Sequence, residues 1–448
     1  MAPSTELARR AFVTACAVTR TTERAAHRFG VAPFLPRLHA DRITHLGGIP
    51  EAEFARQLAD CRSFEDARWT GHWQRYAGEH LARADEALAR LGAPSTAQLL
   101  DETATPDIAT LGQTLAPAVT LLADRGTVAD PAAVARFCAA HPESADPAHA
   151  LDGLIKAMVY ELAAAWPGWS PLRLQAYGRS RKLGEVLLTA LAPAMDLTIE
   201  TVQIPVSGPD IVRGYLVFPT GSGPVPTVLV TNGLEGTLEE VLFPLLAQRD
   251  SGFGTFTMEM PGTYSYADVM SPSSESVYSE VIDHLTKHPR VDADRIGMMG
   301  FSFGGYWSTR MAATDPRLKV AVSNGALTDR SFRVSGSFGT PEIIVSTLRS
   351  TIGAASMADM ARKLAKYSLA QHYRKINIPL LVVNGSHDTL ISTQDSIDLA
   401  IGAPQGQLVL YDGDDHCAMG HSEQWSELST RFLREHLLAG DTVEAVLR

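Results

Sequence analysis

The chain has 448 residues, of which 45% are hydrophobic and 20% are charged, as in an ordinary globular protein with a buried core. Its net charge of -11 at pH 7 disfavours a general affinity for nucleic acid or anionic lipid. No apolar run reaches the length of about 18 residues that a membrane span needs, and the four scattered cysteines form no Cys-x-x-Cys pair. We therefore expect a cytoplasmic protein that binds neither nucleic acid nor membranes.

The first part of the chain has the pattern of an Ala-rich helical domain. In "EHLARADEALARLGAP", Leu81, Leu88 and Leu91 recur at helical spacing, and Gly92 is placed to end the helix. The N-terminal stretch "ELARRAFVTACAVTRTTER" is interpreted as a helix rather than a secretion signal, because its apolar part is short and dotted with threonine. We predict a helical N-terminal domain over residues 1–195.

From Leu197 onward, short β-branched runs alternate with helical segments. The first two runs are close enough to form an antiparallel hairpin, and the later alternation is typical of a mostly parallel sheet with helices on both faces. The sequence thus predicts an α/β fold with an eight-stranded sheet over residues 196–448. The expected strands are 197–206, 211–219, 226–233, 254–262, 295–302, 319–326, 379–388 and 406–413, and the expected helices start near Thr237, Ser273, Phe303, Ser392 and Ser422.

A mainly helical segment, residues 327–378, interrupts this alternation between the sixth and seventh strands. Open α/β sheets bind ligands at the carboxyl ends of their strands, which is where this segment begins. Two interpretations stay open at this point. The insertion is either a lid over a ligand site or an additional pair of packing helices.

The stretch "GMMGFSFGGY" places Ser302 between Gly300 and Gly304, directly after a predicted strand and before a predicted helix. A serine on such a sharp strand-to-helix turn has a strained backbone, and larger side chains two positions before or after it would collide. The pattern therefore predicts a nucleophile elbow. The alternative is that the glycines only allow close packing of a helix on a strand, with Ser302 as a capping residue.

A serine nucleophile needs a base and an orienting acid, which follow it in the chain order Ser, Asp, His in this kind of fold. The seventh strand ends at Asp388, and the eighth leads into a loop with His416. Alone, Asp388 would be interpreted as a turn residue and His416 as a surface histidine. His421 is the rival base but lies where the final helix begins, and Cys417 is expected to be a buried, inert thiol whose side chain points away from His416 in an extended loop. Three nearby acidic residues are interpreted as turn residues: Asp412, Asp414 and Asp415.

Acyl chemistry also needs N–H donors for the developing oxyanion. One is expected from Phe303, the residue after the nucleophile, and the other from Leu234 in the loop "TNGLEGTLEE", where Gly233 allows a tight turn. Glu235 in the same loop has two open interpretations. It either binds a polar part of the substrate or complements the dipole of the following helix.

Five stretches resemble the FrsA-like branch of the α/β-hydrolases: "NGLEGTLEE", "MEMPGTYSY", "VDADRIGMMGFSFGGYW", "DPRLKVAVSNGA" and "LLVVNGSHDTLIS". The resemblance covers roughly residues 150–438. That branch includes fungal enzymes that shorten polyketide chains and bacterial pseudooxynicotine hydrolases, both of which cleave carbon–carbon bonds next to a ketone. The resemblance implies a helical N-terminal domain that caps the active site, a triad of Ser302, Asp388 and His416, and Glu235 as a carboxylate on the substrate side.

The residues and the resemblance together predict a serine hydrolase. It is expected to act through an acyl-enzyme or related tetrahedral mechanism on a ketone- or ester-containing small molecule, with C–C bond cleavage of a polyketide-like substrate as one form. An acyltransferase or cyclase of secondary metabolism with the same triad is one alternative, and a non-catalytic ligand receptor is the other. No cofactor or metal motif is present in the sequence, and a homodimer is compatible with it.

Overall fold

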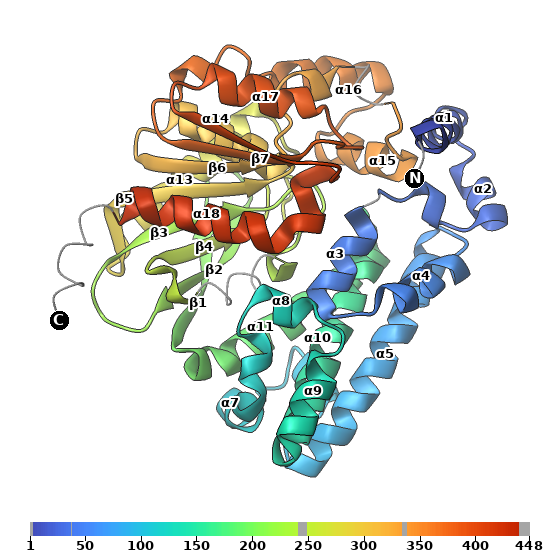
Figure 1. Cartoon of the computed structure of the whole chain (residues 1–448), viewed down its shortest axis with the longest axis vertical. Coiled ribbons are helices and arrows are strands. Elements are labelled where there is room, and N and C mark those ends of the chain that lie inside the picture. Colours follow the sequence, from blue (N-terminus) through green and yellow to red (C-terminus); the bar gives the residue numbers. More distant parts are fainter. Residues whose placement is uncertain (1–2, 37, 241–248, 334–337, 439–448) are drawn as a thin grey trace. The chain divides into compact units, whose positions relative to one another are not determined.

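The computed structural model describes residues 3–36, 38–240, 249–333 and 338–438 (Figure 1). The chain divides into two compact units, one made of Met1–Ala15, Glu200–Leu238 and Asp250–Arg448 and the other of Cys16–Ile199 and Glu239–Arg249. The two units differ from the predicted domains at three short segments, 1–15, 196–199 and 239–249. Within the described ranges, no helix is both long and apolar enough to cross a membrane.

Two long helices, α5 (Asp66–Leu91) and α10 (Ala145–Ala165), pack closely in the helical unit. A Cβ on Gly153 would lie 2.9 Å from the Cβ of Ala84, so only glycine permits this approach. Helix α5 ends as predicted, because Gly92 takes a left-handed conformation with φ of 65°. The other helices of this unit are α2 (Thr22–Phe29), α3 (Leu38–Gly47), α4 (Glu51–Asp60), α6 (Thr96–Leu100), α7 (Ile108–Leu115), α8 (Arg125–Ala129), α9 (Ala133–Ala140) and α11 (Pro171–Leu191).

All eight predicted strands are present and form one sheet in the order β1-β2-β4-β3-β5-β6-β7-β8. Strand β2 pairs antiparallel with β4, whereas the pairs from β4 through β3, β5, β6 and β7 to β8 are parallel. The carboxyl ends of the central strands meet at one edge, since Phe301 lies opposite Asn324 and Asn324 opposite Val383. The strands are β1 (Leu197–Pro205), β2 (Ile211–Pro219), β3 (Val225–Thr231), β4 (Gly254–Met258), β5 (Val291–Phe301), β6 (Leu318–Asn324), β7 (Leu380–Gly385) and β8 (Gly406–Tyr411).

Alternating residues of β5 face different helices, as a strand buried on both sides requires. Ile296 and Met298 belong to the core that contains α13 (Glu275–Leu285) and α14 (Phe303–Thr314). Gly297 between them faces α18 (Ser422–Leu437), because a Cβ there would lie 3.3 Å from Leu437. With α17 (Thr393–Gly402), these helices confirm four of the five predicted helix starts. The fifth, near Thr237, is also confirmed, because a helix begins at Leu238, although residues 241–248 lie outside the described ranges.

The described part of the insertion between β6 and β7 packs into the main core. It contains α15 (Glu342–Thr351) and α16 (Met357–Leu364), with short 3-10 helices before and after this pair. Phe332 and Tyr367 are buried and lie with their ring centroids 5.9 and 5.8 Å from that of Phe303. Both residues lie in short 3-10 helices, Arg330–Phe332 and Ala365–Tyr367, so these parts of the insertion pack on the first residue of α14. A role of the insertion as a lid stays a prediction.

The N-terminal helix α1 (Pro3–Thr19) is hydrogen-bonded to the insertion at Phe338 and Gly339. The guanidinium of Arg10 donates to the carbonyl of Phe338 (2.6 Å), and the hydroxyl of Thr14 accepts from the N–H of Gly339 (2.9 Å). Gly339 has φ of 89° and lies against the side chain of Arg10, so a larger residue would be strained there. These contacts explain why the first residues group with the sheet.

Candidate active site

Ser302 occupies a strained turn between β5 and α14, as the elbow pattern predicts. Its φ of 54° and ψ of -119° lie outside the usual regions for a residue with a side chain. The close packing explains the two glycines, because a Cβ on Gly300 would overlap the carbonyl oxygen of Gly304, and a Cβ on Gly304 would overlap that of Thr231. The N–H of Ser302 donates to the carbonyl of Asn324 (2.7 Å), which ties the turn to β6. The strain is therefore maintained by the surrounding sheet.

The three predicted triad side chains meet at this edge of the sheet. His416 Nε2 lies 2.8 Å from Ser302 Oγ, and His416 Nδ1 lies 2.7 Å from Asp388 Oδ2. The other carboxylate oxygen of Asp388 accepts from the N–H groups of Leu390 (2.8 Å) and Ile391 (2.9 Å). His416 is 3% exposed and Asp388 9% exposed, whereas Ser302 is partly open to solvent. A hydroxyl, an imidazole and a carboxylate thus form one continuous hydrogen-bonded chain.

The environment of His416 has opposing effects on its pKa. Burial lowers the pKa of the imidazole, but the carboxylate of Asp388 and the thiol of Cys417 raise it, and the net effect puts the pKa well above 6.5. An imidazole can accept a proton only when it is neutral. Any reaction that uses His416 as a base is therefore expected to slow as the pH falls through this raised pKa.

The loop that carries His416 is not extended, which corrects one prediction. Cys417 and Ala418 both have left-handed backbones, with φ of 59° and 49°. The thiol of Cys417 is buried as expected, but it contributes to the pKa of His416 instead of pointing away from it. Gly325 makes room for this turn, because a Cβ there would lie 3.1 Å from His416 Cε1.

The rival base His421 has a different carboxylate partner. Its Nδ1 lies 2.8 Å from Asp414 Oδ2, and its ring stacks on Tyr411 at 4.7 Å. Asp415 is 3% exposed and accepts from the backbone N–H (2.7 Å) and the hydroxyl (3.0 Å) of Thr389. The interpretation of Asp414 and Asp415 as simple turn residues is therefore wrong: one binds a histidine, and the other joins two loops.

The loop after β3 lies directly against the nucleophile. A Cβ on Gly233 would be 2.7 Å from the Cβ of Ser302 and 3.0 Å from the carbonyl of Phe301. Leu234 follows Gly233 and is half-buried, while Phe303 begins α14, whose first-turn N–H groups have no acceptor within the helix. Both candidate oxyanion donors therefore lie on segments that contact Ser302, and their role as donors stays a prediction.

Glu235 is 8% exposed, and its backbone is held from the neighbouring loop. The hydroxyl of Tyr264 donates to the carbonyl of Glu235 (2.8 Å). Tyr264 has φ of 38°, a strained value for a residue with a side chain. Both interpretations of the Glu235 carboxylate remain open, because much of the helix that would follow lies outside the described residues.

Asn384, Asp415 and Tyr264 contact site residues but had no predicted role at the site. For Asn384 the sequence held a faint signal, since a polar amide ends the otherwise apolar run "PLLVV". Buried polar side chains need hydrogen-bond partners, so such a residue indicates a specific contact. The identity of that contact depends on the distant His416 loop and could not be inferred locally.

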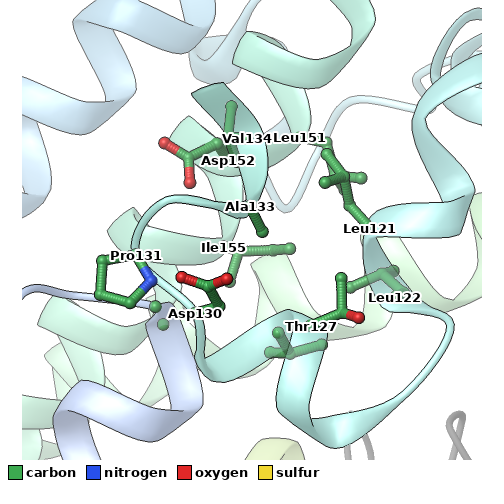
Figure 2. A pocket seen from close by; sticks show the side chains of 13 residues that line it. Leu121, Leu122, Thr127, Asp130, Pro131, Ala133, Val134, Leu151, Asp152 and Ile155 are labelled. Carbon is green, nitrogen blue, oxygen red and sulfur yellow. The ribbon is translucent and has the colours of Figure 1, made fainter. Parts of the chain in front are cut away.

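A small cavity lies within the helical unit, and none of these residues lines it (Figure 2). Its volume is about 30 Å³, and its walls include Leu121, Asp130, Leu151, Asp152 and Ile155. That volume suits one or two water molecules rather than a substrate. Among the residues that the structure describes, no group of three His, Cys, Asp or Glu side chains is arranged to hold a metal ion.

The sheet order, the strained serine and the chain order of the three side chains define an α/β-hydrolase fold. The model of the FrsA-like family, described as "Esterase FrsA-like", matches residues 137–413. This match covers more than half of the chain, and the chain belongs to this family.

Individual relatives share about a quarter of the matched positions. The 2,6-dihydropseudooxynicotine hydrolase of Paenarthrobacter nicotinovorans is 28% identical over 237 residues, which is 52% of this chain and 61% of the relative. The alpha/beta hydrolase psoB of Aspergillus fumigatus is 27% identical over 317 residues, 54% of this chain and 70% of that protein. The crystal structure of a 2,6-dihydroxy-pseudo-oxynicotine hydrolase matches with a TM-score of 0.65 at 21% identity, over 89% of this chain and 96% of that one, which supports the shared fold.

Proposed function

We propose that this protein is a serine-dependent hydrolase that acts on a ketone- or ester-containing small molecule. The observation that carries the proposal is the hydrogen-bonded chain from Ser302 through His416 to Asp388, with the serine on a strained elbow. The membership of the FrsA-like family and the name of its esterase support hydrolysis as the reaction class. The cap role of the helical unit is proposed from the family resemblance alone.

In the proposed mechanism, His416 Nε2 takes the proton of Ser302 as its Oγ attacks the substrate carbonyl carbon. Asp388 keeps Nδ1 protonated and stabilises the imidazolium that forms. The N–H groups of Phe303 and Leu234 donate to the oxyanion. The tetrahedral intermediate collapses to an acyl-serine and a leaving group, which His416 protonates. Water, deprotonated by His416, then attacks the acyl-serine and releases a carboxylic acid.

We further propose that the leaving group can be carbon. In a β-diketone the bond between the attacked carbonyl and the central carbon breaks, and its electron pair leaves as an enolate stabilised by the second ketone. Protonation of that carbon gives a neutral ketone. Glu235, buried in the loop that contacts Ser302, is the side chain proposed to assist the enolate. The similarity to a pseudooxynicotine hydrolase supports this extension.

Two probes with the same acyl group test the proposal. p-Nitrophenyl acetate and benzoylacetone both deliver an acetyl group to Ser302 but release a phenolate and an enolate, respectively. Ser302→Ala should abolish turnover of both probes, and the exposed Ser276→Ala in α13 should leave both unchanged. Glu235→Gln should slow the diketone at least about 10-fold more than the ester.

The fate of the acyl group separates the alternatives. In water labelled with heavy oxygen, hydrolysis places one labelled oxygen in the acetate. Unlabelled acyl products would indicate transfer or ring closure. Full activity of Ser302→Ala would refute the proposed nucleophile, and equal effects of Glu235→Gln on both probes would refute its role in carbon–carbon cleavage.

A further inference from the structure

Asn384 lies at the end of β7, fully buried, and contacts both the acid of the proposed triad and the loop that carries the base. Its amide nitrogen donates to Asp388 Oδ2 (2.9 Å), the same oxygen that His416 approaches. Its amide oxygen accepts from the N–H of Cys417 (3.0 Å), directly after His416, and from that of Gly385 (2.9 Å). One side chain therefore binds the acid and the loop of the base at the same time.

A second contact runs in the opposite direction. Asp415, directly before His416, accepts from the N–H and hydroxyl of Thr389, directly after Asp388. Asn384 thus reaches from the acid strand to the histidine loop, and Asp415 reaches from the histidine loop to the acid loop. We call these two side chains, with their partners, the crossed clamp.

The histidine loop needs such a constraint. Cys417 and Ala418 carry side chains in left-handed conformations, which cost free energy and persist only when neighbouring contacts hold them. The contact of Asn384 reaches the first of these residues, and the contact of Asp415 anchors the position before His416. Without the two ties, the loop could relax and carry the imidazole away from Asp388.

We propose that Asn384 and Asp415 are positioning residues that hold Asp388 and His416 at hydrogen-bonding distance for the reaction. This inference rests on the proposed function, because it concerns how the triad is assembled. The Asp388 carboxylate and the Cys417 thiol both raise the pKa of His416, and Asp415 lies close enough to Asp388 for the two carboxylates to repel each other. The amide of Asn384 offsets that repulsion by donating to Asp388.

Four variants separate positioning from general stability. Asn384→Leu keeps a similar shape but removes all four side-chain hydrogen bonds of Asn384, to Asp388, Gly385, Cys417 and Ser396. Asp415→Ala removes the second tie, while Asp415→Asn retains an oxygen for the N–H of Thr389 and an amide donor for its hydroxyl. Ser396→Ala is the matched control, because Ser396 is buried and touches the Asn384 amide at 3.4 Å without touching the triad. The readouts are the rate at which a fluorophosphonate labels the chain, kcat and KM for p-nitrophenyl acetate, and the melting temperature.

Asn384→Leu and Asp415→Ala should each lower the labelling rate and kcat about 10-fold or more with little change in KM. Asp415→Asn should recover most of the loss, and Ser396→Ala should match the wild type. If Asn384→Leu does not fold, the comparison of Asp415→Ala with Asp415→Asn tests the positioning role instead. The clamp would be overturned if folded Asp415→Ala were labelled at the wild-type rate, or if Asp415→Asn were labelled as slowly as Asp415→Ala. In either case Ser302→Ala should still abolish labelling. An unlabelled wild-type chain would instead refute the proposed function, and the clamp with it.

Discussion

Replacing Gly233 by alanine would test whether the loop after β3 takes part in the reaction. The added Cβ would lie 2.7 Å from the Cβ of Ser302, 3.0 Å from the carbonyl of Phe301 and 3.2 Å from Ser302 Oγ. Gly233 does not have a positive φ, so alanine can adopt its backbone conformation. The effect of the substitution is therefore a steric displacement between the loop and the nucleophile.

The size of the displacement follows from ordinary contact distances. Carbon atoms in van der Waals contact lie at least 3.4 Å apart, so the loop or Ser302 must move by 3.4 - 2.7 = 0.7 Å. A misplacement of about 1 Å in a catalytic arrangement can cost on the order of 10²-fold in rate. We expect Gly233→Ala to lower kcat for p-nitrophenyl acetate by about 10- to 100-fold, because both the attacking oxygen and the proposed Leu234 donor would be shifted.

The assay compares kcat and the melting temperature with those of Gly78→Ala. Gly78 lies in α5 with open space around its Cβ position, so the same chemical change there should leave kcat unchanged and stabilise the helix by about 0.5–1 kcal/mol. A Gly233→Ala protein that is folded and as fast as the wild type would refute the reasoning about this loop.

Three further predictions concern single side chains. Asp388→Asn removes the charge that raises the pKa of His416, so the acid limb of the pH–activity profile should move to lower pH while kcat falls about 10⁴-fold. An acid limb at an unchanged pH would contradict the proposed coupling of Asp388 to His416. Tyr264→Phe loses the hydrogen bond to the carbonyl of Glu235 and should lower kcat about 10-fold without changing KM. Tyr266→Phe loses an equivalent bond to the carbonyl of Glu259 (3.1 Å) and should leave kcat unchanged. Equal effects of the two substitutions on kcat would contradict the prediction. Asp395 is buried and accepts from three backbone N–H groups after β6, so Asp395→Ala should cost about 3 kcal/mol in urea denaturation; a loss below about 1 kcal/mol would argue against its structural role.

The sheet and the elbow could be predicted from the sequence because their signals are local. Short β-branched runs with turn residues between them locate all eight strands. The two glycines around Ser302 reflect a collision that any larger side chain would cause. The partners Asp388 and His416 could then be placed, because the fold fixes their chain order and brings strand ends to one edge.

What the sequence did not reveal depends on contacts between distant segments. Cys417 and Ala418 are not glycine or asparagine, so nothing in their identity signals a left-handed turn. Asn384 finds its partner 33 positions away, and that pairing exists only once β7 and the histidine loop are side by side. The packing of Phe332 and Tyr367 on Phe303 likewise depends on segments that are distant in the sequence.

The most direct test of the central claim is to locate the adduct that a fluorophosphonate leaves on the chain. The wild-type protein is treated with the probe, digested and mapped by mass spectrometry, with Ser302→Ala and His416→Ala treated alongside it. We expect one modified residue, Ser302, with phosphonylation lost in Ser302→Ala and strongly slowed in His416→Ala. An adduct on another residue, or a fully reactive Ser302 in the absence of His416, would contradict the central claim.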